Sequence, residues 1–319
     1  MNRKILSRAR RIVPISGALG LLLGLAGCSG QAGASDDIRL EFDWLSNPEW
    51  RGKAEVAVYH GRVQRYFEDR AAELVLISVT EPFNMEELVK NEAGAGTLVL
   101  KQNQVLSFQT GVYPYRQMNS LFWRAESGDF LKATMTSQEW CGQTFKEARP
   151  VADHLRLTYN SYWEGEANGS QRASLPQLRS GQLALLFDEL PMAVRTAALA
   201  RTDSIYIYPP LMSSQVYRPD FEVGRIARRP VFNRATVRHE TMALTVGARN
   251  YRHVRATTVE WSDSGGTYRD TFYVDEDDED HRLLRWDRHD GGQFLLSELY
   301  YSDYWNQNQT GARLTGSAL

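Results

Sequence analysis

The chain has 319 residues, of which 42% are hydrophobic, 11% aromatic and 24% charged. This length and composition exclude a disordered chain, a collagen-like chain and a small disulfide scaffold. The formal net charge is −2, yet residues 1–27 hold five basic residues and no acidic one, which leaves 32 basic and 39 acidic residues in the rest. A mildly acidic mature chain argues against nucleic acid as a partner.

The first 28 residues have the three-part layout of a secretory signal peptide. A basic start, residues 1–11, precedes an apolar stretch, residues 12–25, which is too short and too interrupted by glycine for a membrane span. The stretch ends in Leu25-Ala26-Gly27-Cys28. An ordinary signal peptide with an incidental cysteine has the same layout, so this alternative stays open.

The Leu-Ala-Gly-Cys ending resembles the lipobox of bacterial lipoproteins. This resemblance implies cleavage before Cys28 and acylation of its thiol, palmitate included, so that the lipidated Cys28 anchors the protein to a membrane. Several acyl chains on one residue hold far more firmly than a single chain does. Ser29 follows the cysteine where Asp would signal retention, so the resemblance favours the periplasmic face of the outer membrane.

Composition divides the chain into four parts. Residues 1–27 are the expected signal peptide, and residues 28–37 are the lipidated cysteine and a small, polar, flexible tether. Residues 38–305 are expected to form a single β-rich domain, with room for a sub-boundary near 225–236. Residues 306–319, polar and rich in turn formers, are expected to be a flexible tail.

Strand patterns dominate the first half of the expected domain, because β-branched and aromatic residues recur in short runs. The runs are 55–59, 73–79, 98–108, 109–123, 131–136 and 155–163. A helical pattern occupies about 182–200, where apolar residues recur every three to four positions. Pro191 is expected to divide this helix.

The last third of the chain is more regular. Five strand-like runs are separated by short turns, two of which contain Gly-Gly, and this arrangement is typical of hairpins. The runs are 241–247, 252–261, 267–274, 281–288 and 293–301. The sequence therefore predicts a mainly β fold: a curved antiparallel sheet or half-barrel, apolar on one face, with one short helical segment (about 182–200).

Two stretches, QTGVYPY (Gln109 to Tyr115) and SQEWCGQ (Ser137 to Gln143), resemble a family of uncharacterised bacterial secreted proteins and lipoproteins. AAELVLISVTEPF, residues 71–83, is similar to the upstream strand of the same family. Some members carry the label septum formation inhibitor Maf, although the early Ser/Pro/Arg-rich motif of Maf pyrophosphatases has no counterpart here. The C-terminal strand pattern resembles the half-barrels of lipoprotein carriers.

The catalytic candidates are few. Glu139 and Glu81 are considered as an acid/base pair, because glycoside hydrolysis needs two carboxylates at a set separation. Cys141 is the one cysteine left beside Cys28 and lacks a base nearby in sequence, so a small buried residue is the simpler interpretation. Glu139 would sit on the same strand face and raise, not lower, its thiol pKa.

No cofactor or metal is expected. The six histidines show no HxH or HExxH spacing, and no phosphate-binding or dinucleotide motif is present. The acidic run 275–280 is interpreted either as a calcium site or as a solvated hairpin tip.

Aromatic residues crowd the middle of the chain, and strand alternation would send several of them to one face. They could line a pocket for an acyl chain, a sugar or a small aromatic ligand, or simply fill the core. The candidate ligand-binding residues are Tyr113, Tyr115, Trp123, Gln138 and Trp140. The sequence favours a noncatalytic binding protein for a hydrophobic or envelope-derived ligand or a partner protein; an envelope hydrolase using Glu139 and a purely structural envelope module are the alternatives.

Overall fold

The computed structural model of the chain describes residues 38–216, 230–263 and 265–314. The expected signal peptide (1–27), Cys28 with its tether (28–37), part of the sub-boundary near 225–236 and the end of the tail (315–319) lie outside the described residues.

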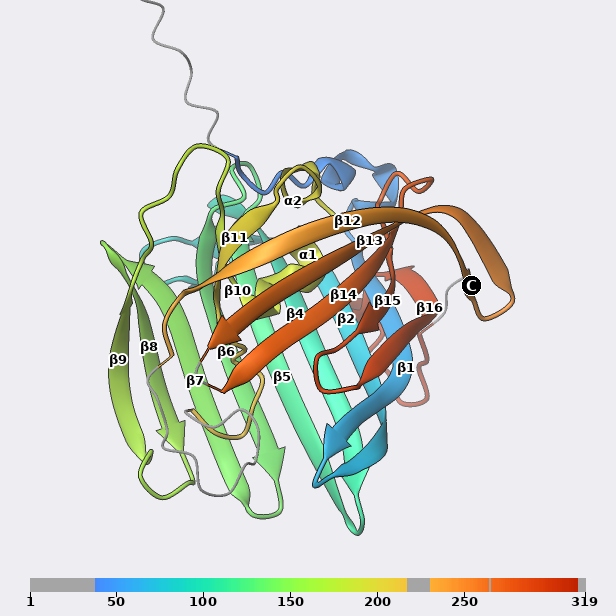
Figure 1. The fold of residues 1–319 in the computed structure, drawn as a ribbon. Helices are drawn as coiled ribbons and strands as arrows, with labels where there is room; N and C mark the ends of the chain where they lie inside the picture. The colour runs from blue at the N-terminus through green and yellow to red at the C-terminus, as the bar shows by residue number, and fades with distance from the viewer. Residues whose placement is uncertain (1–37, 217–229, 264, 315–319) are drawn as a thin grey trace, which may run out of the picture. The chain divides into compact units, whose positions relative to one another are not determined.

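One open, curved sheet dominates the described residues, as the sequence predicts (Figure 1). The chain enters the sheet at its middle and adds antiparallel strands outward to one edge. These strands are β1 (Ala54–Arg65), β2 (Glu68–Asn84), β4 (Thr97–Thr110), β5 (Tyr113–Arg124), β6 (Phe130–Glu139), β7 (Gly142–Val151), β8 (His154–Ser161) and β9 (Asn168–Ser174), with the short β3 (Val89–Lys90) beside β2.

The chain then crosses to the other edge of the sheet and returns strand by strand to the middle, where the last strand pairs with β1. The edge pair β10–β11 is parallel, and the pairs that follow are antiparallel. These strands are β10 (Ala184–Leu186), β11 (Ser204–Tyr208), β12 (Asn233–Val246), β13 (Arg249–Asp263), β14 (Gly266–Asp275), β15 (Leu283–Asp287) and β16 (Gln293–Ser302). The expected C-terminal meander is thus present.

The helical elements are short. They are η1 (Asp43–Ser46), η2 (Pro48–Trp50), η3 (Phe187–Glu189), α1 (Leu190–Ala193), α2 (Ala197–Ala200) and η4 (Tyr304–Asn306). The expected short helical segment at about 182–200 is present, as three short turns of helix that follow the strand β10. Pro191 stands in the first turn of α1, where its missing N–H costs nothing, so it begins a helix and does not divide one.

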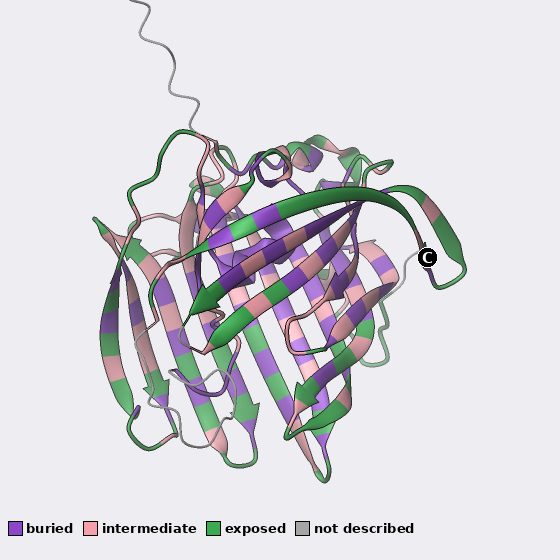
Figure 2. Ribbon diagram, viewed as in Figure 1, coloured by how far each residue is buried: buried purple, intermediate pink, exposed green. Residues whose placement is uncertain are grey.

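Residues 187–200 and 209–216 cover the inner face of the curved sheet; we call residues 209–216 the strap. Side chains alternate between this buried face and the outer face along the strands, which gives the banding in Figure 2. The inner face is not purely apolar. Gln104 of β4 donates to the backbone carbonyl of Asp188 at 2.7 Å, and Asn119 of β5 donates to the Asp188 carboxylate.

Buried polar side chains fasten the strap to the sheet. Lys146 Nζ of β7 donates to the carbonyls of Leu211 and Gln215 at 2.7 and 2.6 Å. Asp188 accepts from the backbone N–H of Leu211 at 2.7 Å, and Glu166 accepts from that of Val216 at 3.0 Å. Irregular backbone can lie in the core because these groups satisfy it.

A buried ion pair links the helical segment to the middle of the sheet. Arg195 forms a two-pronged pair with Glu55 of β1, at 2.6 and 3.0 Å, and also donates to the carbonyl of Asp280. The guanidinium lies 4.8 Å from the centre of the Trp44 ring. Asp280 is itself fully buried and accepts from Asn47, so the acidic run 275–280 is not simply a solvated tip.

The Lys146 contacts predict a pH dependence of stability. Burial lowers the pKa of Lys146 from 10.5 to about 7, so between these pH values the unfolded chain holds the proton more tightly than the folded chain does. Stability therefore rises with pH in this window, by about 2 kcal/mol from pH 7.5 to 9.5. Urea unfolding of Lys146→Met is expected to lack this rise. The exposed-site control Lys53→Met is expected to keep it, and a rise that survives in Lys146→Met would contradict the assignment.

Candidate functional site

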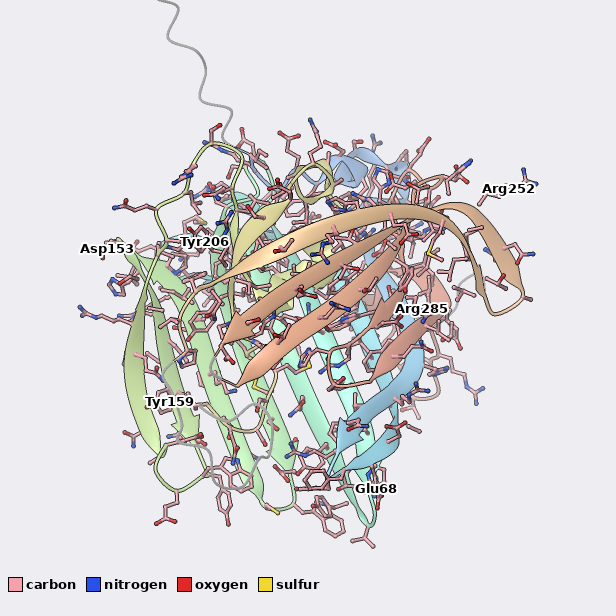
Figure 3. The ribbon with its side chains drawn as sticks, in the orientation of Figure 1. Glu68, Asp153, Tyr159, Tyr206, Arg252 and Arg285 are labelled. Carbon is pink, nitrogen blue, oxygen red and sulfur yellow. The ribbon has the colours of Figure 1, made fainter. Side chains whose placement is uncertain are left out.

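Four hairpin tips lie together at one end of the sheet. They join β1 to β2, β4 to β5, β6 to β7 and β8 to β9, and all point downward in Figure 1. Figure 3 places Glu68 at this end and Asp153, from the β7–β8 turn, at the other. Antiparallel strands of similar length put every second turn at the same end, so residues far apart in sequence meet here.

Each of these tips presents a large apolar side chain to solvent. Phe67 is 93% exposed, Val112 77%, Trp140 72% and Tyr162 62%. We call the five aromatic residues at the tips the aromatic rim: Tyr66, Phe67, Tyr113, Trp140 and Tyr162. Exposed apolar residues in a contiguous row are unusual on a soluble protein and commonly mark a binding surface.

Contacts between the tips make the rim continuous. The Tyr113 hydroxyl donates to the Tyr66 hydroxyl at 3.4 Å, and the Tyr113 and Trp140 rings stack with centroids 6.2 Å apart. The Tyr162 ring packs directly on Gly142, where a Cβ would lie 2.3 Å from Tyr162 Cγ. The strand after the Trp140 tip therefore has to begin with glycine for Tyr162 to join the row.

Tyr115 supports the rim from below. It is fully buried, stacks on Phe108 at 4.8 Å and shares a 2.8 Å hydrogen bond with Tyr66, while Arg65 donates to its hydroxyl at 3.2 Å. Burial, with the nearby Glu139 carboxylate, raises the pKa of Tyr115, so its hydroxyl stays protonated. This bonding holds the exposed ring of Tyr66 and the half-buried ring of Tyr113 in place.

Glu139 lies just inside the rim, at the end of β6. It is 8% exposed, and neither carboxylate oxygen accepts a well-aligned hydrogen bond from the described residues. Such a group is costly to bury. Glu139 lies between Tyr115 and the Trp140 tip, so it is one of the residues that form the site.

The β1–β2 turn keeps its aromatic residues in an unfavourable backbone conformation. Tyr66 and Phe67 have φ of 55° and 61°, in the left-handed region that Asn and Gly normally occupy in such turns. Each bulky residue there costs on the order of 1 kcal/mol. Strain of this kind clusters at functional positions, and here it coincides with the most exposed ring of the rim.

Most of the predicted ligand-binding residues meet at the rim, but one does not. Tyr113, Tyr115, Gln138 and Trp140 lie there, from strands β5 and β6 and the turn after β6. Trp123 lies at the far end of β5, is fully buried and donates from Nε1 to Glu189 at 2.7 Å. The ring and the N–H of Trp123 are thus both used inside the core, away from the other four candidates.

The catalytic candidates do not form an active site. Glu81 pairs with Lys101 at 2.7 Å near the opposite end of the sheet, beside Val99, whereas Glu139 ends β6 at the rim. Along β5 this separation corresponds to about nine residues, or roughly 30 Å at 3.3 Å each, too far for a carboxylate pair in glycoside hydrolysis. The acid/base pair is therefore wrong. Cys141 is exposed in the two-residue β6–β7 turn, so the buried interpretation of this residue and its shared strand face with Glu139 are also wrong.

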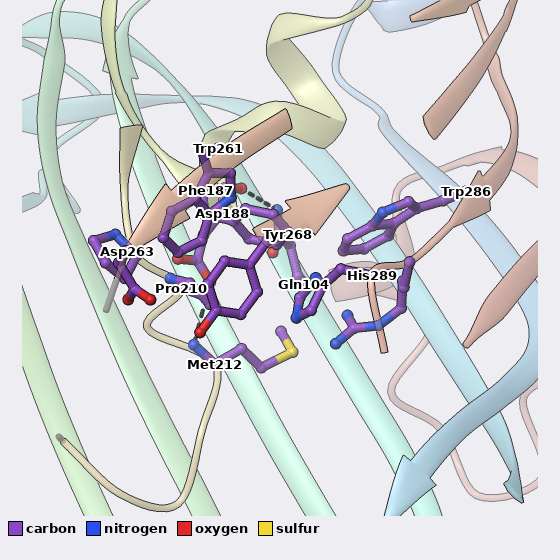
Figure 4. Close-up of a pocket in the computed structure, with 12 residues that line it drawn as sticks. Gln104, Phe187, Asp188, Pro210, Met212, Trp261, Asp263, Tyr268, Trp286 and His289 are labelled. Atoms are coloured by element: carbon purple, nitrogen blue, oxygen red, sulfur yellow. Dashed lines mark hydrogen bonds between the residues drawn. The ribbon is translucent and has the colours of Figure 1, made fainter. Parts of the chain in front are cut away.

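A small ring-lined cavity lies elsewhere, between the strap and β13–β15 (Figure 4). Its volume is about 60 Å³, and its walls include stacked rings of Trp261 and Tyr268, 4.3 Å apart. Pockets for organic ligands are usually about 300–1,000 Å³. This cavity is too small for an acyl chain or a sugar.

A histidine–aspartate pair that the sequence analysis did not predict borders this cavity. His289 Nδ1 lies 2.8 Å from Asp270, which also accepts from Trp286 Nε1 at 3.0 Å. Burial alone lowers the pKa of His289, but the hydrogen bond and charge of Asp270 outweigh it and the net pKa is raised. The described lining residues include no Ser, Thr or Cys nucleophile. The sequence does contain a sign of this pair. Asp270 stands at a position of β14 where the two-residue alternation calls for an apolar, inward-facing residue.

The described residues offer one further candidate surface. An open depression of about 580 Å³ lies over β12, β13 and β14, with mixed charges and hydroxyls. Within residues 38–216, 230–263 and 265–314, no group of three or more His, Cys, Asp or Glu side chains is placed to hold a metal. No helix in the described part of the chain has the length and apolarity of a membrane span.

Comparisons with known proteins add little beyond the fold. No protein-family model matches the chain, and no curated protein matches it. Among solved structures, it is similar to a beta-barrel-like protein of a domain of unknown function, DUF1849, from Brucella abortus, with 10% identity and a TM-score of 0.45. The match covers 78% of this chain and 98% of that one.

The strained β1–β2 turn predicts an unusual pair of substitutions. Phe67→Gly and Phe67→Ala both remove the exposed ring, but only glycine accepts a φ of 61° without strain. The Gly variant is expected to be more stable than the Ala variant by about 0.5–1 kcal/mol in urea unfolding. Equal stability of the two variants, or a less stable Gly variant, would show that the turn stores no strain.

Proposed function

We propose that the protein is a lipid-anchored, noncatalytic binding protein of the bacterial envelope, held at the periplasmic face of the outer membrane. Its binding surface is the aromatic rim. The observation that carries this proposal is the row of exposed rings at the end of the sheet opposite the start of the described chain.

The start of the described chain and the rim are at opposite ends of the sheet. Gly128, in the β5–β6 turn, lies against Leu40, because a Cβ there would be 1.8 Å from the Leu40 carbonyl oxygen. From this turn to the rim, the twelve residues of β5 extend over about 40 Å. The ten residues from Cys28 to Asp37 reach at most about 36 Å. This reach is shorter than the length of β5, so we propose that the anchor leaves the rim accessible to other envelope components.

The inner face of the sheet is already filled, which favours a binding site on the surface over one in the interior. A half-barrel that carries an acyl chain needs an open inner face, whereas residues 187–200 and the strap occupy this face with satisfied hydrogen bonds. Binding through the exposed tips requires no such opening. Glu81 and Glu139 lie too far apart to act together, which argues against the hydrolase alternative. A purely structural module is the remaining alternative.

The anchor is testable by fractionation. Cys28→Ser is expected to release the chain from the membrane fraction into the soluble periplasm and to abolish labelling with radioactive palmitate. Cys141→Ser, at an exposed turn cysteine, is the matched control and should keep both properties. Retention of label in the Cys28→Ser chain would contradict acylation at this residue.

The binding surface is testable in cells. A photo-crosslinking amino acid at position 112 or 141, both exposed at the tips and outside the aromatic rim itself, is expected to form adducts with an envelope component. The same probe at position 153, equally exposed at the other end of the sheet, is expected to form none. No adducts from the rim, or adducts from position 153 alone, would favour the structural module.

A further inference from the structure

The centre of the rim combines a flat ring with unused amides. Gln138 and Gln143 face each other across the β6–β7 turn and flank Trp140. Both amides are exposed, and neither makes a hydrogen bond to another described residue. A sugar ring has an apolar face for stacking and a rim of hydroxyls for hydrogen bonding, which is the chemistry that this pattern of ring and amides complements.

The spacing of the tips suits a polymer. Neighbouring strands lie about 5 Å apart, so successive tips, two strands apart, recur about every 10 Å. Tyr113, Trp140 and Tyr162 stand on three successive tips, and the Tyr113 and Trp140 rings lie closer than the tips, with centroids 6.2 Å apart. A glycan laid along the rim would therefore contact these two rings through neighbouring sugar units.

The charge of the tips argues for a neutral partner. The four tip segments, residues 64–69, 109–115, 138–143 and 160–166, contain one arginine, five acidic residues and no lysine. An anionic lipid surface is usually bound through clustered Lys and Arg. The exposed Val112 and Phe67 add apolar contact, which would suit the methyl group of an acetamide better than a plain hydroxyl.

We propose that the aromatic rim binds cell-wall glycan: a β-1,4-linked polymer of N-acetylated amino sugars laid across the hairpin tips. Trp140 stacks on a sugar ring, Gln138 and Gln143 bond its acetamide and hydroxyl groups, and Tyr113 and Tyr162 contact the units on either side. This inference rests on the proposed function of the rim, and names its ligand class.

The test uses the purified mature chain with two probes, sedimentation with isolated cell-wall sacculi and titration with the hexasaccharide of N-acetylglucosamine. Trp140→Ala is expected to weaken both interactions about tenfold or more, as truncation of a central tryptophan does. Trp305→Ala is the matched control, because Trp305 is 43% exposed in η4, away from the rim; its effect should stay within about twofold. Binding should change little with salt, since no cationic cluster is involved.

Two results would overturn the glycan inference. One is a wild-type chain that binds neither sacculi nor the hexasaccharide, or binds them equally well with Trp140→Ala. The other is a crosslinker at position 141, which keeps Trp140 in place, that captures an envelope protein and no glycan in cells. The second result leaves the rim standing as a binding surface, so the failure of the ligand class is distinguishable from the failure of the proposed function.

Discussion

The inner face of a long curved sheet has to be covered, and this protein covers it with its own chain. The covering residues are irregular backbone, which is stable in a core only if its polar groups are paired. Lys146, Asp188 and Glu166 supply that pairing from the sheet and its connections, while Arg195 and Glu55 fix the helical segment to the middle strand. Because these bonds fill the interior, the binding surface that we propose lies on the outside of the sheet.

The hairpin tips are the part of the outside that departs most from an ordinary soluble surface. Stability alone would favour Asn or Gly at the β1–β2 turn and polar residues at the others. The chain instead holds Tyr66 and Phe67 at positive φ and places Trp140 in the open. The buried Tyr115 fixes the neighbouring rings, so the rim is arranged before any ligand arrives, which lowers the entropy cost of binding.

Local patterns predicted the strands and the meander because a two-residue period survives burial, as residues 267–273 of β14 illustrate. The helical segment at about 182–200 is more broken than its apolar spacing suggests, because Leu185, Phe187 and Leu190 are all buried and their spacing does not mark one face of a helix. Trp123 and Trp140 both belong to the aromatic-rich middle of the chain. The sequence does not show that Trp123 lies at the end of the sheet where it is buried and Trp140 at the end where it is exposed. The inward glutamines of β4 and the inward Asp270 of β14 were readable signs of buried polar pairing, but their partners are far away in the chain.

The central claim is that recognition takes place at the rim and not in the interior. Hydrogen–deuterium exchange of the purified mature chain, with and without soluble cell-wall glycan fragments, tests it directly. The account predicts added protection in residues 64–69, 109–115, 138–143 and 160–165, with no change in the strap or around the His289 cavity. Protection confined to residues 187–216 or 261–289 would contradict it and place the ligand inside the sheet.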